Sequence, residues 1–109
     1  MKLNLPIIAQ RYFETQNAHD IEAMVACFAL DAAVRDEGRG IRGTEAVRAW
    51  KTEASANYRI TAEPLECHVD AGGAVVVVKV SGIFPGSPAN PAYRFGFAAD
   101  GRISTLEVQ

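Results

Sequence analysis

The sequence has few residues of the kinds that bind metals or cross-link chains. Its two cysteines, Cys27 and Cys67, and its two histidines, His19 and His68, fall into no CxxC or HExxH spacing. A P-loop and a serine at a strand-turn-helix elbow are also missing. We therefore expect no metal, no cofactor and no hydrolase triad. For the cysteines we favour buried free thiols, with a disulfide as the alternative.

An excess of charge of one sign is missing too. The 11 basic and 13 acidic side chains leave a net charge of -2, which gives no electrostatic footprint for nucleic acid or an anionic membrane. No apolar stretch approaches the roughly 20 residues that span a bilayer. The first residues, Met1 to Pro6, lack the apolar run of a signal peptide, so a cytoplasmic location is expected.

The composition that remains is that of one globular domain. The chain has 109 residues, of which 49% are hydrophobic, and a chain of that size buries one core but not two. No internal repeat, low-complexity segment or linker divides it. We therefore expect a single domain over residues 1–109, with any binding site inside or beside its one core.

Apolar residues at helical spacing predict three helices. Asn4 is expected to cap the first helix, with Pro6 in its first turn, and Asp20 to cap the second. After a short strand, Gly38-Arg39-Gly40 predicts a turn, and Thr44 is expected to cap the third helix. The apolar stripes are Leu5, Ile8, Ala9, Tyr12 and Phe13 in the first helix, Ile21, Met24, Val25 and Phe28 in the second, and Val47, Trp50 and Ala54 in the third.

The rest of the chain is predicted to be a β meander. Around Pro64 the inward positions change phase, which indicates a β-bulge that bends the strand over 58–69. The inward residues are Ile60 and Ala62 before the bulge and Leu65, Cys67 and Val69 after it. Segment 74–80 is so apolar that it should be a central strand covered on both faces. The helices cover one face, and we expect a second copy of the sheet to cover the other, which predicts a homodimer. The 85–91 loop forms either the lip of a site or a plain hairpin tip.

Three polar side chains are predicted to point into the core. Asp36 shares the strand parity of Val34, Tyr12 lies on the apolar stripe of the first helix, and Tyr93 alternates with Phe95 on a late strand. The alternative for each tyrosine is a core aromatic whose hydroxyl reaches a backbone carbonyl or the surface. For Asp36 the alternative is a strand-end carboxylate that reaches solvent or pairs with a nearby arginine, such as Arg39 or Arg42.

Several segments together resemble the nuclear transport factor 2-like superfamily, in its SnoaL-like and ketosteroid isomerase-like branch. They are Gln10-Arg11-Tyr12-Phe13, Gln16 to Asp20, Cys27 to Asp36, Ile41 to Trp50, Phe95-Gly96-Phe97 and Asp100 to Ile103. The resemblance implies an α+β cone, in which three N-terminal helices pack on a strongly curved, mixed, mostly antiparallel sheet that encloses a pocket. It is specific for fold and weak for function, because this scaffold hosts isomerases, cyclases, hydratases and non-catalytic binders.

The isomerase branch of that superfamily implies roles for two of the inward residues. Tyr12 falls at the position of an oxyanion donor and Asp36 at the position of the base, whereas Tyr93 stands where the family has an aspartic acid. The resulting hypothesis is proton transfer on a small apolar carbonyl compound, with Asp36 as base and Tyr12 and Tyr93 as hydrogen-bond donors. Trp50, Phe28, Phe95 and Phe13 are the candidate substrate-binding residues. The alternative is a non-catalytic module for ligand binding or dimerisation.

Overall fold

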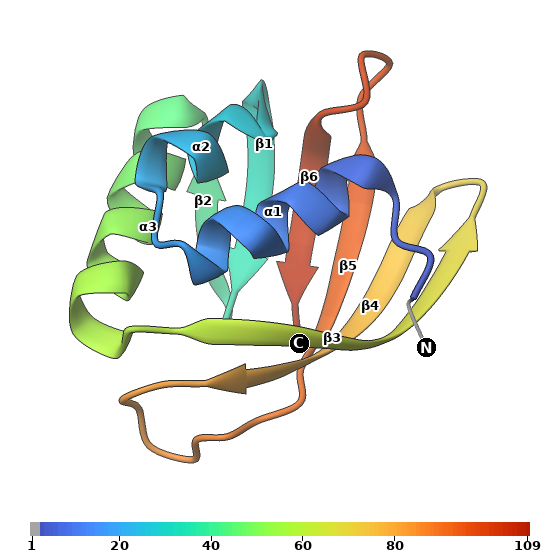
Figure 1. Ribbon diagram of the computed structural model, residues 1–109. Helices are drawn as coiled ribbons and strands as arrows, with labels where there is room; N and C mark the ends of the chain where they lie inside the picture. The colour runs from blue at the N-terminus through green and yellow to red at the C-terminus, as the bar shows by residue number, and fades with distance from the viewer. Residues whose placement is uncertain (1–2) are drawn as a thin grey trace.

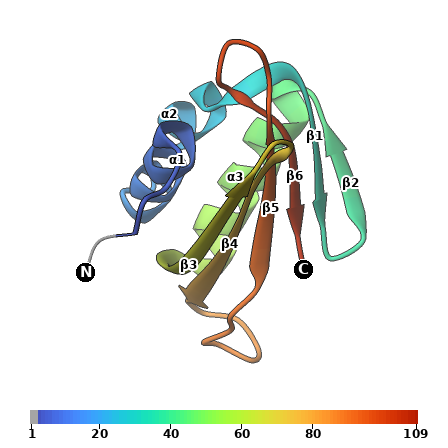
Figure 2. The same ribbon diagram turned by 90° about the vertical axis from the view of Figure 1, so that its right-hand side faces the viewer.

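The computed structural model describes residues 3–109 and contains three helices and six strands. The helices are α1 (Ile7–Asn17), α2 (Ile21–Ala26) and α3 (Thr44–Tyr58). The strands are β1 (Phe28–Asp36), β2 (Arg39–Arg42), β3 (Thr61–Asp70), β4 (Gly73–Ser81), β5 (Ala92–Phe97) and β6 (Ile103–Val108). All three helices lie on one side of the sheet, which curves around them (Figure 1 and Figure 2). The predicted α+β cone is confirmed.

The six strands form one sheet in the order β2-β1-β6-β5-β4-β3. Only β1 and β6 pair in parallel, while every other neighbouring pair is antiparallel, so the sheet is mixed and mostly antiparallel as predicted. The parallel pair joins the first strand of the chain to the last. It therefore brings the end of β1 beside the end of β6, close to the C-terminus (Figure 1).

Helix α1 begins later than the sequence predicts. Its N-cap is Pro6, and no side chain caps it, so the prediction of Asn4 as the cap is wrong. Proline fixes φ near its helical value and lacks an N–H that would need a partner, so it can begin the helix without a capping side chain. The predicted apolar stripe is confirmed, since Ala9, Tyr12 and Phe13 are buried, and Gln16 is buried with them.

Helix α2 begins as predicted and ends early. The side chain of Asp20 accepts a hydrogen bond from the backbone N–H of Ala23 at 3.2 Å, which confirms the N-cap. The helix has only six residues and ends at Ala26, so Phe28 lies at the start of β1 rather than on the helix. The spacing correctly predicted that Phe28 is buried. It did not distinguish a helix from a strand, because a bulky apolar residue fits a buried strand equally well.

The predicted turn at 38–40 is displaced by one residue, because the chain forms a β-hairpin here. Glu37 and Gly38 have φ of 52° and 78°, the geometry of a two-residue type I′ hairpin turn, and Arg39 already belongs to β2. The run Gly38 to Gly43 has the GxGxxG spacing of dinucleotide-binding loops. Here Gly40 lies inside β2, which pairs with β1 in antiparallel, so the run lacks the strand-loop-helix context of that motif.

Helix α3 begins at Thr44 with Gly43 as its N-cap, so Thr44 is not the cap that we predicted. Gly43 has φ of 86°, a conformation that favours glycine over any residue with a Cβ. The predicted inner face is confirmed, because Val47, Trp50 and Ala54 are buried. Tyr58, which we placed at the start of the next strand, is instead the last residue of this helix.

Strand β3 carries the predicted bulge, since its register with β4 shifts between Pro64 and Glu66. Leu65 and Val69 were predicted to face a covered core, yet they are 39% and 63% exposed. Val69 pairs with the buried Ala74 and so shares its face of the sheet, but the end of the β3–β4 hairpin extends beyond α1, where no helix covers it (Figure 1). Val69 therefore points to the predicted face of the sheet, and it is exposed because the helices do not extend over it.

Strand β4 lies between β3 and β5, as expected for an interior strand. Val76, Val78 and Val80 are buried on the helix side, whereas Val75 and Val77 are half-buried on the other face. Both cysteines are free thiols, which confirms the preferred prediction, but only Cys27 is buried as predicted, whereas Cys67 is half-buried.

Candidate functional site

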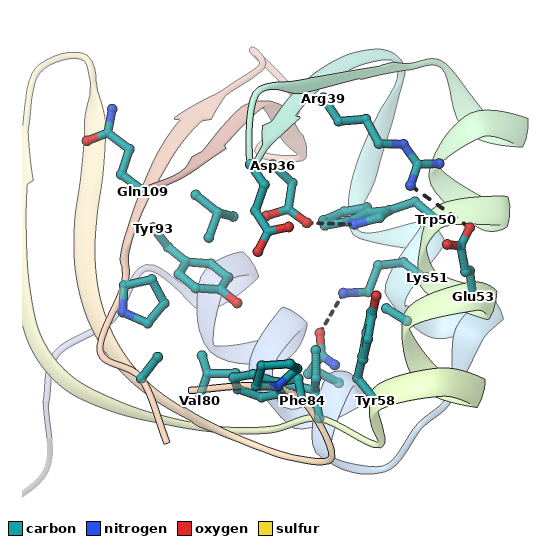
Figure 3. Close-up of a pocket in the computed structure, with 18 residues that line it drawn as sticks. Asp36, Arg39, Trp50, Lys51, Glu53, Tyr58, Val80, Phe84, Tyr93 and Gln109 are labelled. Atoms are coloured by element: carbon teal, nitrogen blue, oxygen red, sulfur yellow. Dashed lines mark hydrogen bonds and ion pairs between the residues drawn. The ribbon is translucent and has the colours of Figure 1, made fainter. Parts of the chain in front are cut away.

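A cavity of 670 Å³ opens between α3, the sheet and the loop that follows β4 (Figure 3). This volume lies in the range of small-molecule sites, about 300–1,000 Å³. Most of the wall is apolar, formed by Trp50, Ala54, Tyr58, Ile60, Val80, Phe84, Pro85, Ala89, Pro91, Tyr93 and Val108. The polar lining residues are Gln16, Asp36, Glu37, Arg39, Lys51, Glu53 and Gln109. A mostly apolar cavity with a few polar groups suits a small organic molecule rather than a polyanion.

Asp36 and Tyr93 reach this cavity from one row of the sheet. Asp36 on β1 pairs with Val108 on β6, and Tyr93 on β5 pairs with Val108 from the other side. Residues in one row point to the same face, and strands lie about 4.8 Å apart, so the two Cα atoms are roughly 10 Å apart. Both residues line the cavity, so a ligand held there meets a carboxylate and a phenol. The predicted inward parity of both residues is confirmed.

The carboxylate of Asp36 is held by α3. The indole Nε1 of Trp50 donates a hydrogen bond to Oδ2 of Asp36 at 3.1 Å, drawn as a dashed line in Figure 3. Trp50 is 7% exposed, so packing fixes the donor. One carboxylate oxygen is therefore oriented by the protein, and Asp36 has no salt bridge within residues 3–109. The arginine partner considered as an alternative for Asp36 is not found there.

The hydroxyl of Tyr93 points into the cavity (Figure 3). It has no hydrogen-bond partner among the described residues and is not a sealed buried group, so it remains free to donate to a ligand. Burial, and secondarily the negative charge of Asp36, raises the pKa of Tyr93 above the usual value of tyrosine. The phenol is therefore neutral over the physiological pH range and acts as a donor.

Lys51 is a cavity residue that our sequence reasoning missed. Its Nζ donates to the hydroxyl oxygen of Tyr12 at 2.9 Å and to Oε1 of Gln16 at 2.6 Å. Tyr12 and Gln16 are one turn apart on α1, so both acceptors meet the amine from the same helix face. Helical spacing gave a signal, because Val47, Lys51 and Ala54 recur at intervals of four and three and so share one face of the helix.

Lys51 is buried, with only 3% of the residue exposed. Nζ also lies 4.3 Å from the centroid of the Trp50 ring and 5.1 Å from that of Tyr12. Burial disfavours the charged form and lowers the pKa of Lys51 to about 7, although the attraction of Asp36 acts in the opposite direction. The neutral amine is therefore well populated at physiological pH, which is rare for lysine.

Four residues predicted to line the site lie in the core instead. Tyr12, Phe13, Phe28 and Phe95 are between 0% and 3% exposed and form a cluster of edge-on aromatic contacts. None of them belongs to the cavity wall. The physical reason is packing between layers: Phe28 and Phe95 lie on the sheet under α1, and Tyr12 and Phe13 are the α1 residues packed on them, so no empty space remains between these side chains. Of the predicted substrate-binding residues, Trp50 alone lines the cavity.

The mouth of the cavity is formed by charged side chains and by the loop after β4. Arg39 and Glu53 form a salt bridge of 3.9 Å with both side chains more than half exposed. Glu37 also lines this edge of the cavity, because it lies in the hairpin turn. On the opposite side Pro85 and Pro91 line the cavity, so the 85–91 loop forms the lip of a site. Of the two interpretations of this loop, the structure therefore favours the lip of a site over the plain hairpin tip.

The described residues form neither a metal site nor a membrane-spanning helix. Within residues 3–109 there is no group of three or more histidine, cysteine, aspartate or glutamate side chains placed to hold a metal ion. None of the helices in the described chain is long and apolar enough to cross a membrane. His19 is engaged elsewhere, with its Nδ1 at 3.1 Å from the hydroxyl of Ser55.

Comparison with known proteins places this geometry in context. The model of the SnoaL-like domain family matches residues 9–105. The crystal structure of a "putative polyketide cyclase" from Sinorhizobium meliloti has 44% sequence identity and a TM-score of 0.92, with 96% of this chain and 95% of that chain covered. None of the curated proteins matches the sequence.

Two more distant structures share the fold alone. A Mycobacterium tuberculosis protein, in complex with estradiol-17beta-hemisuccinate, has 21% identity and a TM-score of 0.83, with 96% of this chain and 93% of that chain covered. The epoxide hydrolase/cyclase-like enzyme SalBIII of pyran ring formation in salinomycin also has 21% identity and a TM-score of 0.83, with 94% and 86% covered.

Proposed function

The chain belongs to the SnoaL-like domain family of the nuclear transport factor 2-like superfamily, and we propose that it catalyses proton transfer on a small apolar carbonyl compound bound in the cavity. The observation that carries this proposal is the pairing of Asp36 and Tyr93 across Val108 at the cavity wall. A base and a neutral donor then face one space from the same row of the sheet.

In the proposed reaction Asp36 removes a proton from the carbon next to the carbonyl group. The negative charge that develops on the carbonyl oxygen is met by the hydroxyl of Tyr93, which is neutral and free to donate. The apolar wall excludes water and strengthens that hydrogen bond. Asp36 then returns the proton to the same or another carbon, which completes an isomerisation or begins a ring closure.

Trp50 supports the proposed base, whereas Tyr12 does not face the substrate. Trp50 orients the carboxylate through its bond from Nε1 to Oδ2 and forms part of the apolar wall. Tyr12 was expected to be an oxyanion donor, but its hydroxyl accepts a hydrogen bond from Lys51 and lies outside the cavity wall. Tyr12 therefore holds the amine of Lys51 and takes no direct part in the proposed proton transfer.

The relatives support the class of substrate. The Sinorhizobium meliloti relative carries the description of a polyketide cyclase. Polyketides bear carbonyl groups, and cyclisation through carbon begins with loss of a proton beside one of them. The Mycobacterium tuberculosis structure shows that this fold accommodates a steroid derivative. Both descriptions agree with a largely apolar cavity that holds a few polar groups.

Isotope exchange tests the proposal without knowledge of the natural substrate. The protein is incubated in D₂O with cyclohexanone or 2-tetralone as probes, and loss of the α-proton signal is followed by NMR. Exchange that exceeds the rate in buffer and saturates with probe concentration supports proton-transfer catalysis. Saturable binding of the probes with no faster exchange would identify a non-catalytic binding module instead.

We further propose that the outer face of the sheet forms a homodimer. Glu107 on β6 lies between Arg94 on β5 and Arg35 on β1 in one row, and Val75 and Val77 lie half-buried on the neighbouring β4. A row with opposite charges side by side can pair with its own copy after a two-fold rotation. A second copy would also cover the half-buried valines.

A further inference from the structure

The proposed proton transfer leaves Lys51 without a chemical role. Three lysines occur in the chain, and Lys51 is the one that lines the cavity among residues 3–109. A buried cation requires compensation, yet no carboxylate forms a salt bridge with it within residues 3–109. At this position burial disfavours the charged amine, so the neutral form, which is the nucleophilic one, is favoured.

The position of Nζ leaves one direction open to the cavity. Two of its bonding directions are taken by the hydroxyl of Tyr12 and by Oε1 of Gln16. Figure 3 shows the Lys51 side chain reaching from α3 with its amine turned toward the middle of the cavity, opposite the hydroxyl of Tyr93. A carbonyl group held between these walls would meet the amine on one side and a hydrogen-bond donor on the other.

We propose that Lys51 captures an aldehyde or an unhindered ketone in this cavity as an imine. The lone pair of Nζ attacks the carbonyl carbon, and the carbon–oxygen double bond becomes the single bond of a carbinolamine. The carbinolamine then loses its hydroxyl oxygen as water, which carries away the two hydrogens that Nζ contributed. The product is a carbon–nitrogen double bond to Lys51, formed with no oxidant, metal or other cofactor.

The neighbouring groups suit this sequence of steps. The lowered pKa of Lys51 keeps a large share of the amine neutral near pH 7, so its lone pair is available. Loss of water needs a proton donor beside the carbinolamine, and the neutral Tyr93 faces the same space. The charged and titratable groups around Nζ are Tyr12 from α1, Asp36 from β1 and Tyr93 from β5, with Glu37, Arg39 and Glu53 at the cavity mouth.

Imine capture goes beyond the proposed function, because it requires Lys51 and a carbonyl group but no proton transfer by Asp36. The two proposals therefore fail separately. Benzaldehyde has no α-proton, so its capture reports on Lys51 alone, whereas loss of α-proton exchange in Asp36→Asn reports on the base. Lys79 provides a matched reference within the same chain, because it is an exposed lysine on β4 outside the cavity. An ordinary exposed lysine is almost entirely protonated at neutral pH and captures carbonyls slowly.

Reductive trapping tests the inference directly. The intact protein is incubated at pH 7.5 with benzaldehyde and sodium cyanoborohydride, which reduces an imine to a stable secondary amine. Peptide mapping by mass spectrometry then gives the rate of labelling at each lysine. We expect Lys51 to be labelled at least about 10-fold faster than Lys79, because most of its amine is neutral at this pH. The preference should disappear in urea, where both lysines are exposed.

Three outcomes would overturn the inference. They are equal labelling of the two lysines in the folded protein, no adduct at Lys51, and a preference for Lys51 that persists in urea. The wild-type protein suffices for this comparison, so the result does not depend on a variant that must fold. Lys51→Arg adds a check, since a guanidinium does not form this imine. The adduct at position 51 should then be absent, while labelling of Lys79 stays unchanged.

Discussion

Asp36 and Tyr93 flank Val108 in a single row of the sheet, so that a carboxylate and a free phenol face one cavity from strands far apart in the sequence. The parallel pairing of β1 with β6 creates this relationship, because it sets the end of the first strand beside the end of the last. Trp50 then fixes the carboxylate from the helix above. The candidate chemistry thus depends on topology as much as on residue type.

Removal of the Tyr93 hydroxyl should slow the proposed reaction. Tyr93→Phe keeps the aromatic packing, because the hydroxyl has no protein partner within residues 3–109. We expect the rate of α-proton exchange to fall by about 10²-fold, the usual cost of a lost oxyanion donor. Tyr58→Phe is the matched control, since it removes a hydroxyl from another tyrosine of the same cavity wall. An equal loss in both variants would exclude a specific role for Tyr93.

Lys51 should make the stability of the fold depend on pH. Its pKa is about 7 in the folded chain, below the ordinary value of 10.5 that applies when the chain is unfolded. Below pH 7 the amine is protonated in both states, and the cost of burying its charge is fully present. Between about pH 7 and 10 the unfolded chain retains a proton that the folded chain has released, so stability rises with pH.

Replacement of that lysine should remove this dependence. Relative to Lys51→Met, the free energy of unfolding of the wild type should rise by about 1 kcal/mol per pH unit from pH 7 to 9. Urea denaturation at several pH values measures this difference, and Lys79→Met, at an exposed position, should track the wild type. A difference between wild type and Lys51→Met that is constant over this range would show that the amine stays charged when buried.

Those features of the fold and the site that follow from local spacing could be predicted from the sequence. Periodicity predicted the three helices, the bulge near Pro64 and the inward parity of Asp36 and Tyr93, because each follows from local spacing. The extra strand β2 was missed, since its four residues show no alternating pattern and the adjacent glycines suggested a turn alone.

The cavity wall was harder to predict than the fold. Phe28 and Phe95 have inward parity, but whether an inward side chain meets empty space or a helix depends on how the layers pack. Lys51 was missed because a charged residue beside Trp50 is ordinarily solvated, and its burial follows from acceptors that α1 supplies, 35 and 39 residues away in the sequence. Such long-range contacts leave only a weak trace in the local pattern.

The proposed homodimer predicts that a charge in the middle of the outer face of the sheet separates the copies. Val75→Lys places a lysine between His68 and Arg94 in one row, so the row becomes more positive on both copies. Light scattering after size-exclusion chromatography should show a dimer for the wild type and a monomer for this variant. Ile83→Lys, at an exposed site outside the sheet, should remain dimeric. A monomeric wild type would refute the proposed interface.

The role of Asp36 as the base is the central claim, and one comparison tests it most directly. Asp36→Asn preserves an oxygen that accepts the hydrogen bond from Trp50, so the variant should fold while losing the base. Asp31→Asn makes the same chemical change at an exposed position on the same strand. The measurement is the rate of α-deuterium exchange into 2-tetralone in D₂O for both variants and the wild type. We predict a loss of about 10²-fold or more for Asp36→Asn and an unchanged rate for Asp31→Asn. Exchange by Asp36→Asn at the wild-type rate would contradict the account.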